Sequence, residues 1–321
     1  MRLNLTRIEQ AANELPPEFS RTPHYESPVL SRSLGCSVTL KVETLNPIRC
    51  FKGRGTEVAI SSAMLEGYSE FVCASAGNLG QALAYSARSR GVSATVVASR
   101  SANAEKLKRI SEFGATLELV EGDIECARDT ARRISQSGAY LIEDSENLGT
   151  CEGAATIGLE LTNDLALPFD AVVVALGGGA LATGVGHVLK QRSPSTKLVC
   201  VQPKGAPAMT LSWRAKAVIN TDSMDTIADG VAGRFPIPEV LSDLLEVADD
   251  AYLVDESSII EGVRTLYETA GLIVEPSAAL GIAAILENPD DFHGMRVATV
   301  ICGSNISSAD HLAMVGNQNG G

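Results

Sequence analysis

A lysine in a glycine-rich setting is the first feature of this sequence that could do chemistry. Lys52 follows Phe51 and precedes the run Gly-Arg-Gly at 53–55, just before a helical pattern. An isolated lysine in a surface loop is usually only solvated. A lysine that forms an imine must lose its proton, which requires a desolvated pocket or a cationic neighbour. Arg54 and Arg49 are candidates for that neighbour, and Lys52 is therefore the candidate nucleophile.

Two loops between a strand pattern and a helix pattern are candidate anion sites. The first contains Ser75, Ala76, Gly77 and Asn78, and the second runs from Gly177 to Leu181 with three consecutive glycines. Backbone N–H groups that open a helix point at an anion, and the helix dipole favours its charge. The first loop could hold a carboxylate and the second a phosphate, although each could also be an ordinary turn.

Cys302 ends the last predicted strand, where the sequence reads Ile301-Cys-Gly-Ser-Asn305. A lone cysteine is most often a buried structural thiol. Its place at the carboxyl end of a strand also makes it a candidate ligand contact, because open α/β sheets bind ligands at that edge.

The elements that must position these residues alternate between strand and helix, which predicts parallel α/β sheets. Residues 205–250 are less regular and rich in Gly and Pro. The predicted strands are 71–75, 94–98, 116–120, 139–142, 171–176, 198–202 and 296–301. The predicted helices are 79–90, 104–113, 124–136, 151–165, 181–191, 255–270 and 277–286.

Composition narrows the class of protein. The 321 residues are 45% hydrophobic and 20% charged, which suits a folded core, and the net charge of −13 argues against nucleic acid or an anionic membrane as partner. The seven cysteines are odd in number and form no C-x-x-C pair, as a reduced compartment tolerates. We see no signal peptide and no apolar run of about 18 residues, so we expect a cytoplasmic protein.

In their order and spacing, these motifs resemble the fold type II pyridoxal 5'-phosphate (PLP) enzymes of the serine/threonine dehydratase family. Further similar stretches are Thr226–Gly230 and Val274–Ala278, so the resemblance covers most of the chain. It implies two open, twisted, mostly parallel sheets flanked by helices, as in tryptophan synthase β-like proteins. It also implies a large cofactor-binding domain, 1–55 with 146–321, and a small domain, 56–145, that carries the carboxylate loop.

The resemblance also implies roles for individual residues. Lys52 would hold PLP as a Schiff base and move the Cα proton, Phe51 would pack on the ring, and Cys302 would face the ring nitrogen. Asn78 would bind the ring hydroxyl, and Ala232 would lie near the substrate. The carboxylate loop would be Ser75, Ala76, Gly77, Asn78 and Leu79, and the phosphate loop would be Gly177, Gly178, Gly179, Ala180 and Leu181.

Details within the family favour a dehydratase. Racemases present a serine where this chain has Ala76, and their divalent-metal site opens with a glutamate where this chain has Gln202, so no metal is implied. The departures lie near the substrate and cofactor: Arg49, Glu-Asp-Ser at 143–145, and alanines at 155 and 180. A cation at Arg49 could bind a second substrate carboxylate, as in 3-hydroxyaspartate, or form only a surface ion pair.

The function that the resemblance implies is α,β-elimination. A β-hydroxy amino acid such as L-serine, L-threonine or 3-hydroxyaspartate would give a 2-oxo acid and ammonia. Two alternatives remain open, a β-replacement enzyme of the cysteine synthase type and a non-catalytic PLP-binding module. The expected partners are the amino-acid substrate and a second copy of the chain, in a homodimer.

Overall fold

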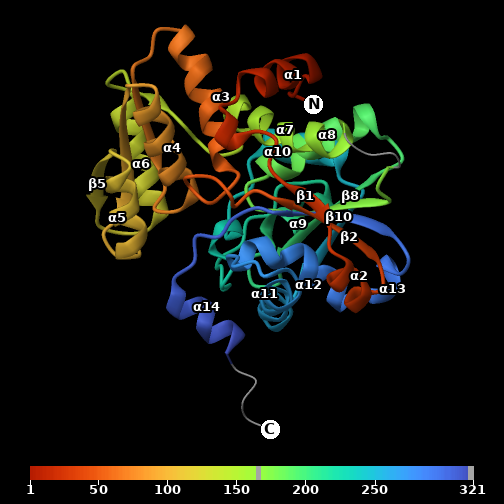
Figure 1. Cartoon of the computed structure of the whole chain (residues 1–321). Coiled ribbons are helices and arrows are strands. Elements are labelled where there is room, and N and C mark those ends of the chain that lie inside the picture. The colour runs from red at the N-terminus through yellow and green to blue at the C-terminus, as the bar shows by residue number, and fades with distance from the viewer. Residues whose placement is uncertain (164–167, 317–321) are drawn as a thin grey trace.

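The computed structural model describes residues 1–163 and 168–316, whose strands form two separate sheets (Figure 1). The six-stranded sheet has the order β1-β2-β10-β7-β8-β9, and the four-stranded sheet has the order β5-β4-β3-β6. The strands of the larger sheet are β1 (His24–Glu26), β2 (Ser37–Val42), β7 (Ala171–Ala175), β8 (Lys197–Pro203), β9 (Asp250–Val254) and β10 (Arg296–Ile301). Those of the smaller sheet are β3 (Glu70–Ala74), β4 (Ser93–Ser99), β5 (Thr116–Val120) and β6 (Tyr140–Leu141).

All strand pairs are parallel except β1 with β2, the antiparallel edge. The position of β10 matters most for the site, because β10 pairs with both β2 and β7. Its end therefore lies beside the chain that leaves β2, and a bridge between Cys50 and Gly303 continues the contact beyond the strands. This pairing brings the segment around residue 50 next to the segment around residue 302.

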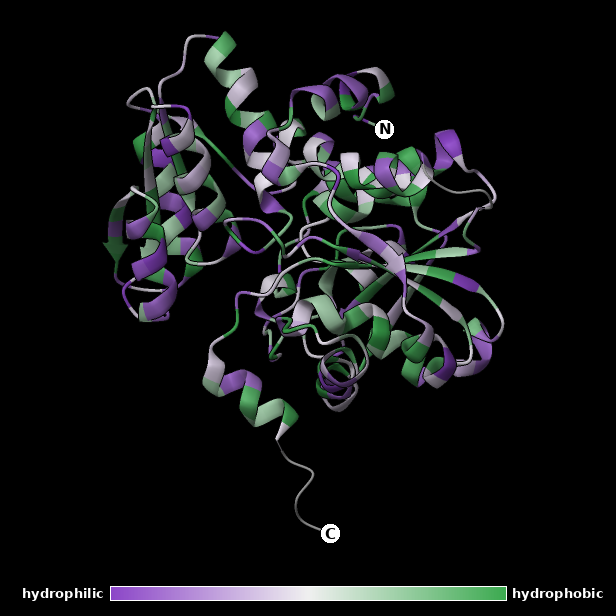
Figure 2. Cartoon of the chain, viewed as in Figure 1, coloured by the Kyte–Doolittle hydropathy of each residue, from purple (hydrophilic) through white to green (hydrophobic). Residues whose placement is uncertain are grey.

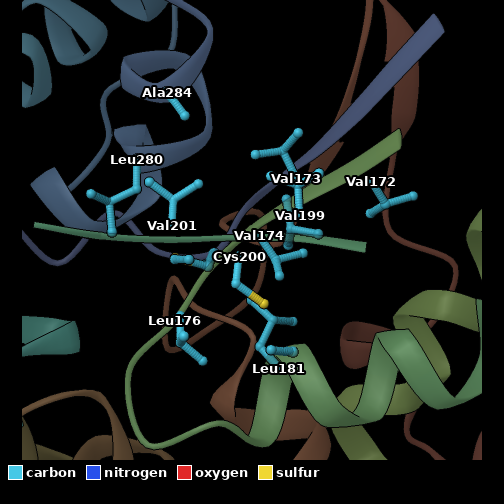
Figure 3. Packing of buried hydrophobic residues seen from close by; sticks show 14 of the residues in the cluster. Val172, Val173, Val174, Leu176, Leu181, Val199, Cys200, Val201, Leu280 and Ala284 are labelled. Carbon is cyan, nitrogen blue, oxygen red and sulfur yellow. The ribbon is translucent and has the colours of Figure 1, made fainter. Parts of the chain in front are cut away.

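Helices cover both faces of each sheet, as parallel strands require. Figure 3 shows Leu280 and Ala284 of α12 on one side of β7 and β8, with Leu181 of α8 on the other. The larger sheet and its layers hold α1 (Leu5–Glu14), α2 (Pro28–Leu34), α7 (Leu148–Asn163), α8 (Ala180–Arg192), α9 (Ala208–Ala215), α10 (Pro238–Val247), α11 (Glu256–Ala270), α12 (Leu280–Glu287), α13 (Pro289–Phe292) and α14 (Ser308–Val315). The short 3-10 helices are η1 (Pro17–Phe19), η2 (Asp229–Val231) and η3 (Pro276–Ala279).

The smaller sheet lies among α3 (Lys52–Leu65), α4 (Asn78–Ser89), α5 (Ala104–Glu112) and α6 (Ile124–Ser135). Neighbouring residues of a strand point to opposite faces. Phe71 and Cys73 thus pack in the cluster with α3 and α4, whereas Val72 packs with α6. Figure 2 shows the result as hydrophobic inner strands between helices that alternate hydrophobic and hydrophilic residues.

The predicted fold class is confirmed, and the differences are local. The last strand of the small sheet is only Tyr140–Leu141, and the helix predicted at 277–286 is divided into η3 and α12. The helix predicted at 151–165 begins earlier, at Leu148, and its residues 164–165 lie outside the described residues. The irregular stretch 205–250 contains α9 and α10. Hydrophobic periodicity locates elements better than it locates their ends.

No helix in the described parts of the chain combines the length and the apolar character that crossing a membrane requires. The division into domains with boundaries at 55 and 145 stays a prediction, although the two sheets separate along similar lines.

Candidate active site

A cavity of about 990 Å³ lies where the carboxyl ends of strands from both sheets converge. Its walls include the segments that follow β3, β6, β7 and β10. Ligands of open α/β sheets bind at this edge. Every residue to which the resemblance assigned a role lines this cavity: Phe51, Lys52, Ser75, Ala76, Gly77, Asn78, Leu79, Gly177, Gly178, Gly179, Ala180, Leu181, Ala232 and Cys302.

Lys52 is the first residue of α3, and its side chain is 15% exposed. The next residue has to be glycine, because a Cβ at Gly53 would lie 2.2 Å from Cε1 of Phe19. The amine lies 4.7 Å from the ring centre of Phe51 and 2.5 Å from Oδ2 of Asp144. Lys52 therefore reaches the cavity from a fixed backbone, and an anion is its immediate neighbour.

The prediction that Arg54 or Arg49 flanks Lys52 is wrong. Arg54 is fully buried, and its guanidinium donates hydrogen bonds to Glu43 at 2.7 Å and to Glu160 at 2.7 Å. Arg49 is exposed and lies outside the cavity lining. The backbone of Arg49, with φ of 54°, instead helps to hold the chain beside the last strand, because its carbonyl accepts a hydrogen bond from the N–H of Ser304. The sequence could not show this, because an arginine near a lysine in the chain can point to the opposite side.

The carboxylate loop leads from β3 into α4, whose first residue is Asn78. Ser75 Oγ accepts a hydrogen bond from the N–H of Gly77 at 3.1 Å and so folds the loop. The N–H groups of the first helical turn have no carbonyl acceptor within the helix. This helix start therefore suits an anionic group, with Ala76 and Leu79 beside it in the cavity wall.

The glycine loop connects β7 to α8, a helix of 13 residues. Gly179 has φ of 113°, a conformation that only glycine adopts readily. A Cβ at Gly178 would lie 2.8 Å from Ser145 Oγ, so glycine is what lets the loop pack closely against that hydroxyl. Ser145 Oγ also accepts a hydrogen bond from the N–H of Ala180 at 3.0 Å. The sequence marked Ser145 only as part of an unusual loop, so the contact of its hydroxyl with the start of α8 was not predicted.

Cys302 follows β10, lines the cavity and is 5% exposed. Burial, reinforced by the nearby Glu275 carboxylate, raises the pKa of the Cys302 thiol well above its ordinary value, so the thiol stays protonated. Ser277 also lines the cavity, and its buried hydroxyl has no hydrogen-bond partner. These polar but uncharged groups offer hydrogen bonds to a ligand without a fixed charge.

A hydrogen-bond network behind the cavity was not foreseen. Asn78 donates to Glu275 at 2.8 Å, and its amide oxygen accepts from Asn305 at 2.7 Å. Glu275 also accepts from the backbone N–H of Asn305 at 2.9 Å. Burial raises the pKa of Glu275. The stretch around 274–278 resembled the family, but periodicity gives no sign of a buried glutamate that joins two sheets.

Comparisons with known proteins agree with this geometry. The family model described as pyridoxal-phosphate dependent enzyme matches residues 15–303, which is most of the chain. The L-threonine ammonia-lyase of Thermotoga maritima is 34% identical over 95% of this chain and 76% of that protein. A serine racemase of Oryza sativa subsp. indica is 30% identical over 93% of this chain and 90% of that protein.

A solved structure of maize serine racemase superposes with a TM-score of 0.90 at 27% identity, over 97% of this chain and 96% of that one. The chain therefore belongs to the family of pyridoxal-phosphate-dependent enzymes, and within it resembles both ammonia-lyases and serine racemases. Its cofactor is pyridoxal 5'-phosphate, as the resemblance implied.

The residues present fit this cofactor. Lys52 lines the cavity, and so does the glycine loop, which leads into the N-terminus of α8, where backbone N–H groups favour a phosphate. The buried hydroxyl of Ser277 is a further hydrogen-bonding group in the wall, with no partner among the described residues. No cluster of three or more His, Cys, Asp or Glu side chains with metal-binding geometry occurs among residues 1–163 and 168–316.

Proposed function

We propose that this protein is a lyase that eliminates the β-hydroxyl group of an amino acid such as L-serine or L-threonine and releases a 2-oxo acid and ammonia. The observation that carries the proposal is the placement of Lys52 in one cavity with the 75–79 loop, the glycine loop and Cys302. Relatives named as ammonia-lyases and racemases support the amino-acid substrate but leave the outcome of the reaction open.

The proposal gives Lys52 two tasks. It anchors the cofactor covalently, and after the substrate takes its place it removes the proton from Cα. The bound cofactor supplies an electron sink for the electrons of the broken Cα–H bond. Because α3 begins at Lys52 and Gly53 is packed against Phe19, the amine stays close to the position from which it was displaced.

The remaining residues bind and orient. The start of α4 would hold the substrate carboxylate, which fixes Cα relative to Lys52. The start of α8 would hold the cofactor phosphate through the N–H groups that open the helix. Asn78 keeps a second amide hydrogen beyond the one it gives to Glu275, and it would donate that hydrogen to the ring hydroxyl.

The neutral thiol of Cys302 supports elimination over reactions that need a long-lived carbanion. A protonated thiol cannot hold a positive charge on the ring nitrogen in the way that a carboxylate does. Negative charge at Cα is then less delocalised, which favours prompt departure of a group from Cβ. The methyl group of Ala76 supports the same outcome, because it cannot return a proton to Cα.

β-Replacement remains the second candidate, since it shares every step up to loss of the β-substituent. We also propose that the protein acts in the cytoplasm as a homodimer. The exposed apolar side chains Tyr267 and Leu312 on α11 and α14 support an association surface, and light scattering on the purified protein measures its mass.

The test is a panel of amino acids assayed for 2-oxo acid and ammonia without any added thiol or amine. We expect equal amounts of both products from L-serine or L-threonine, and none from the Lys52→Ala variant. Product that forms only when a thiol or amine is supplied would identify a β-replacement enzyme. A cofactor-loaded protein that releases no 2-oxo acid from any amino acid would refute the lyase proposal.

A further inference from the structure

Asp144 is the acidic side chain closest to the reacting centre. Its Oδ2 lies 2.5 Å from the amine of Lys52, and its buried Oδ1 accepts no hydrogen bond from any described residue. The side chain as a whole is 30% exposed and lines the cavity. A buried carboxylate oxygen without a donor is costly, so this atom is a ready acceptor for a ligand.

The pairing with Lys52 does not survive cofactor binding. A lysine that is covalently bound to the cofactor no longer offers a free ammonium to Asp144, and neither does one that has become the neutral base. In both states the carboxylate has lost its charged partner, although the neutral amine can still donate a weaker hydrogen bond. The substrate amino group takes over the bond to the cofactor and offers no free ammonium either, so a hydrogen-bond donor on the substrate side chain is the group left to meet Asp144.

The other cations of the cavity are already engaged with carboxylates. Lys106 pairs with Asp229, and Arg132 pairs with Glu143 at 3.2 Å. Arg128 pairs with Glu125 at 2.6 Å, and Arg234 pairs with Asp123 at 3.5 Å. Cofactor binding therefore removes the positive charge of Lys52 from the cavity wall, while the charges of the carboxylates remain.

Two further acids in the wall form no ion pair with any described residue. Glu146, two residues from Asp144, and Glu239 both line the cavity, and the pKa of Glu146 is raised chiefly by its hydrogen bond to Glu143. The raised pKa shows that negative charge is already crowded in this loop. Among the described residues of this wall, no free cation would receive a second carboxylate on a substrate.

We propose that Asp144 determines which substrate side chains the cavity accepts: those that are neutral or donate a hydrogen bond at Cβ, and not those that carry a second carboxylate. The inference rests on the proposed amino-acid substrate and deepens it by naming the class. A β-hydroxyl can donate to Asp144, whereas the carboxylate of 3-hydroxyaspartate is repelled by it. Arg49 does not offset this repulsion, because it lies outside the cavity.

The experiment compares two inert ligands that differ only in charge, L-asparagine and L-aspartate. Their dissociation constants are measured by calorimetry on the cofactor-loaded enzyme and on variants at position 144. We expect the unmodified enzyme to prefer L-asparagine, and Asp144→Asn to shift the ratio of the two constants towards L-aspartate roughly tenfold. Asp144→Glu, which keeps the charge, is expected to keep the preference.

The matched control is Glu146→Gln, which removes an exposed carboxylate from the same loop. It should shift the ratio less than Asp144→Asn does, because the Glu146 side chain is exposed and solvent screens its charge. Should Asp144→Asn fail to load cofactor, Asp144→Ser replaces it with the same expectation. An unchanged ratio in the neutral variants, or an equal shift in the Glu146 control, would overturn the assignment of Asp144.

The two proposals fail in distinguishable ways. Each preparation is also assayed for 2-oxo acid from L-serine. Ligand discrimination that depends on Asp144 without any elimination would refute the lyase function and leave this inference standing. Normal elimination with discrimination that ignores Asp144 would do the reverse.

Discussion

Asn78 and Glu275 are joined by a hydrogen bond of 2.8 Å, although Asn78 opens a helix of the smaller sheet and Glu275 precedes η3 beside the larger one. Asn305, which follows the last strand, binds both residues. The three side chains therefore fix the carboxylate loop relative to Cys302. Through these hydrogen bonds, residues attached to the two sheets form a single site.

Glu275→Gln should weaken cofactor binding. An amide has one oxygen where the carboxylate has two, so either Asn78 or the N–H of Asn305 loses its acceptor in a buried place, at a cost of about 1–3 kcal/mol. We expect the dissociation constant of the cofactor to rise about tenfold, measured by equilibrium titration. The control is Glu268→Gln on the exposed surface of α11. Equal affinities in all three proteins would show that the network does not support the cofactor.

Cys302→Asp should change the products rather than only the rate. A carboxylate facing the ring nitrogen keeps that nitrogen protonated, which stabilises negative charge at Cα and gives it time for other fates. We expect transamination-like side products to rise and 2-oxo acid to fall, measured by chromatography of a complete L-serine reaction. Cys302→Ser, a neutral replacement, is the control. A product ratio that stays the same in Cys302→Asp would place this side chain away from the ring nitrogen.

Ala76 should keep this enzyme from racemising its substrate. Racemisation needs a second acid or base on the face of Cα opposite Lys52, and a methyl group supplies neither. L-serine should therefore give pyruvate with little D-serine, and Ala76→Ser should raise the share of D-serine, both followed by chiral chromatography. The control is Ala76→Val, which adds bulk without a hydroxyl and so shows any effect of side-chain size alone on the share of D-serine. Abundant D-serine from the unmodified enzyme would mean that another residue delivers the second proton.

Glu160 should make stability depend on pH. Burial alone would raise its pKa, but hydrogen bonds and charge from Arg54 and Lys41 prevail and lower the pKa from 4.5 to about 2. A depressed carboxyl pKa stabilises the fold above pH 4.5, and this contribution of about 2–3 kcal/mol fades as pH falls towards 2.

The measurement is the free energy of unfolding of the unmodified protein and of Glu160→Gln, in urea with excess cofactor. The gap between the two should be widest near pH 7 and should narrow at pH 3. Glu26→Gln, on an exposed edge strand, should open no such gap. A gap that is constant with pH would mean that the charge of Glu160 is not what stabilises the fold.

The sequence predicted the fold where local patterns are strong. Buried strands such as Ala171–Ala175 are short apolar runs between turn-forming residues, here Asp170 before the strand and Gly177 after it. A loop that leads from such a strand into a helix must lie at the carboxyl edge of the sheet. That rule was sufficient to bring the 75–79 loop, the glycine loop and Cys302 to one cavity. These residues lie directly after predicted strands, so predicting the strands was enough to predict the edge of the sheet at which they lie.

The sequence did not predict the direction in which individual charged side chains point. Arg54 looked like a neighbour of Lys52, but on α3 it faces the opposite side and is buried against Glu43 and Glu160. Asp144 looked like a departure in a loop, yet tertiary packing puts it against the lysine. Charged partners that are distant in the chain leave no periodic trace, so only the structure could find them.

The most direct test of the account is to locate the covalent attachment of the cofactor. Purified enzyme is reduced with borohydride, digested, and analysed by mass spectrometry, with the unreduced protein as the reference. We predict a single cofactor adduct on the peptide that contains Lys52, and loss of that adduct in Lys52→Ala. An adduct on any other lysine would contradict the assignment of Lys52 and the site built around it.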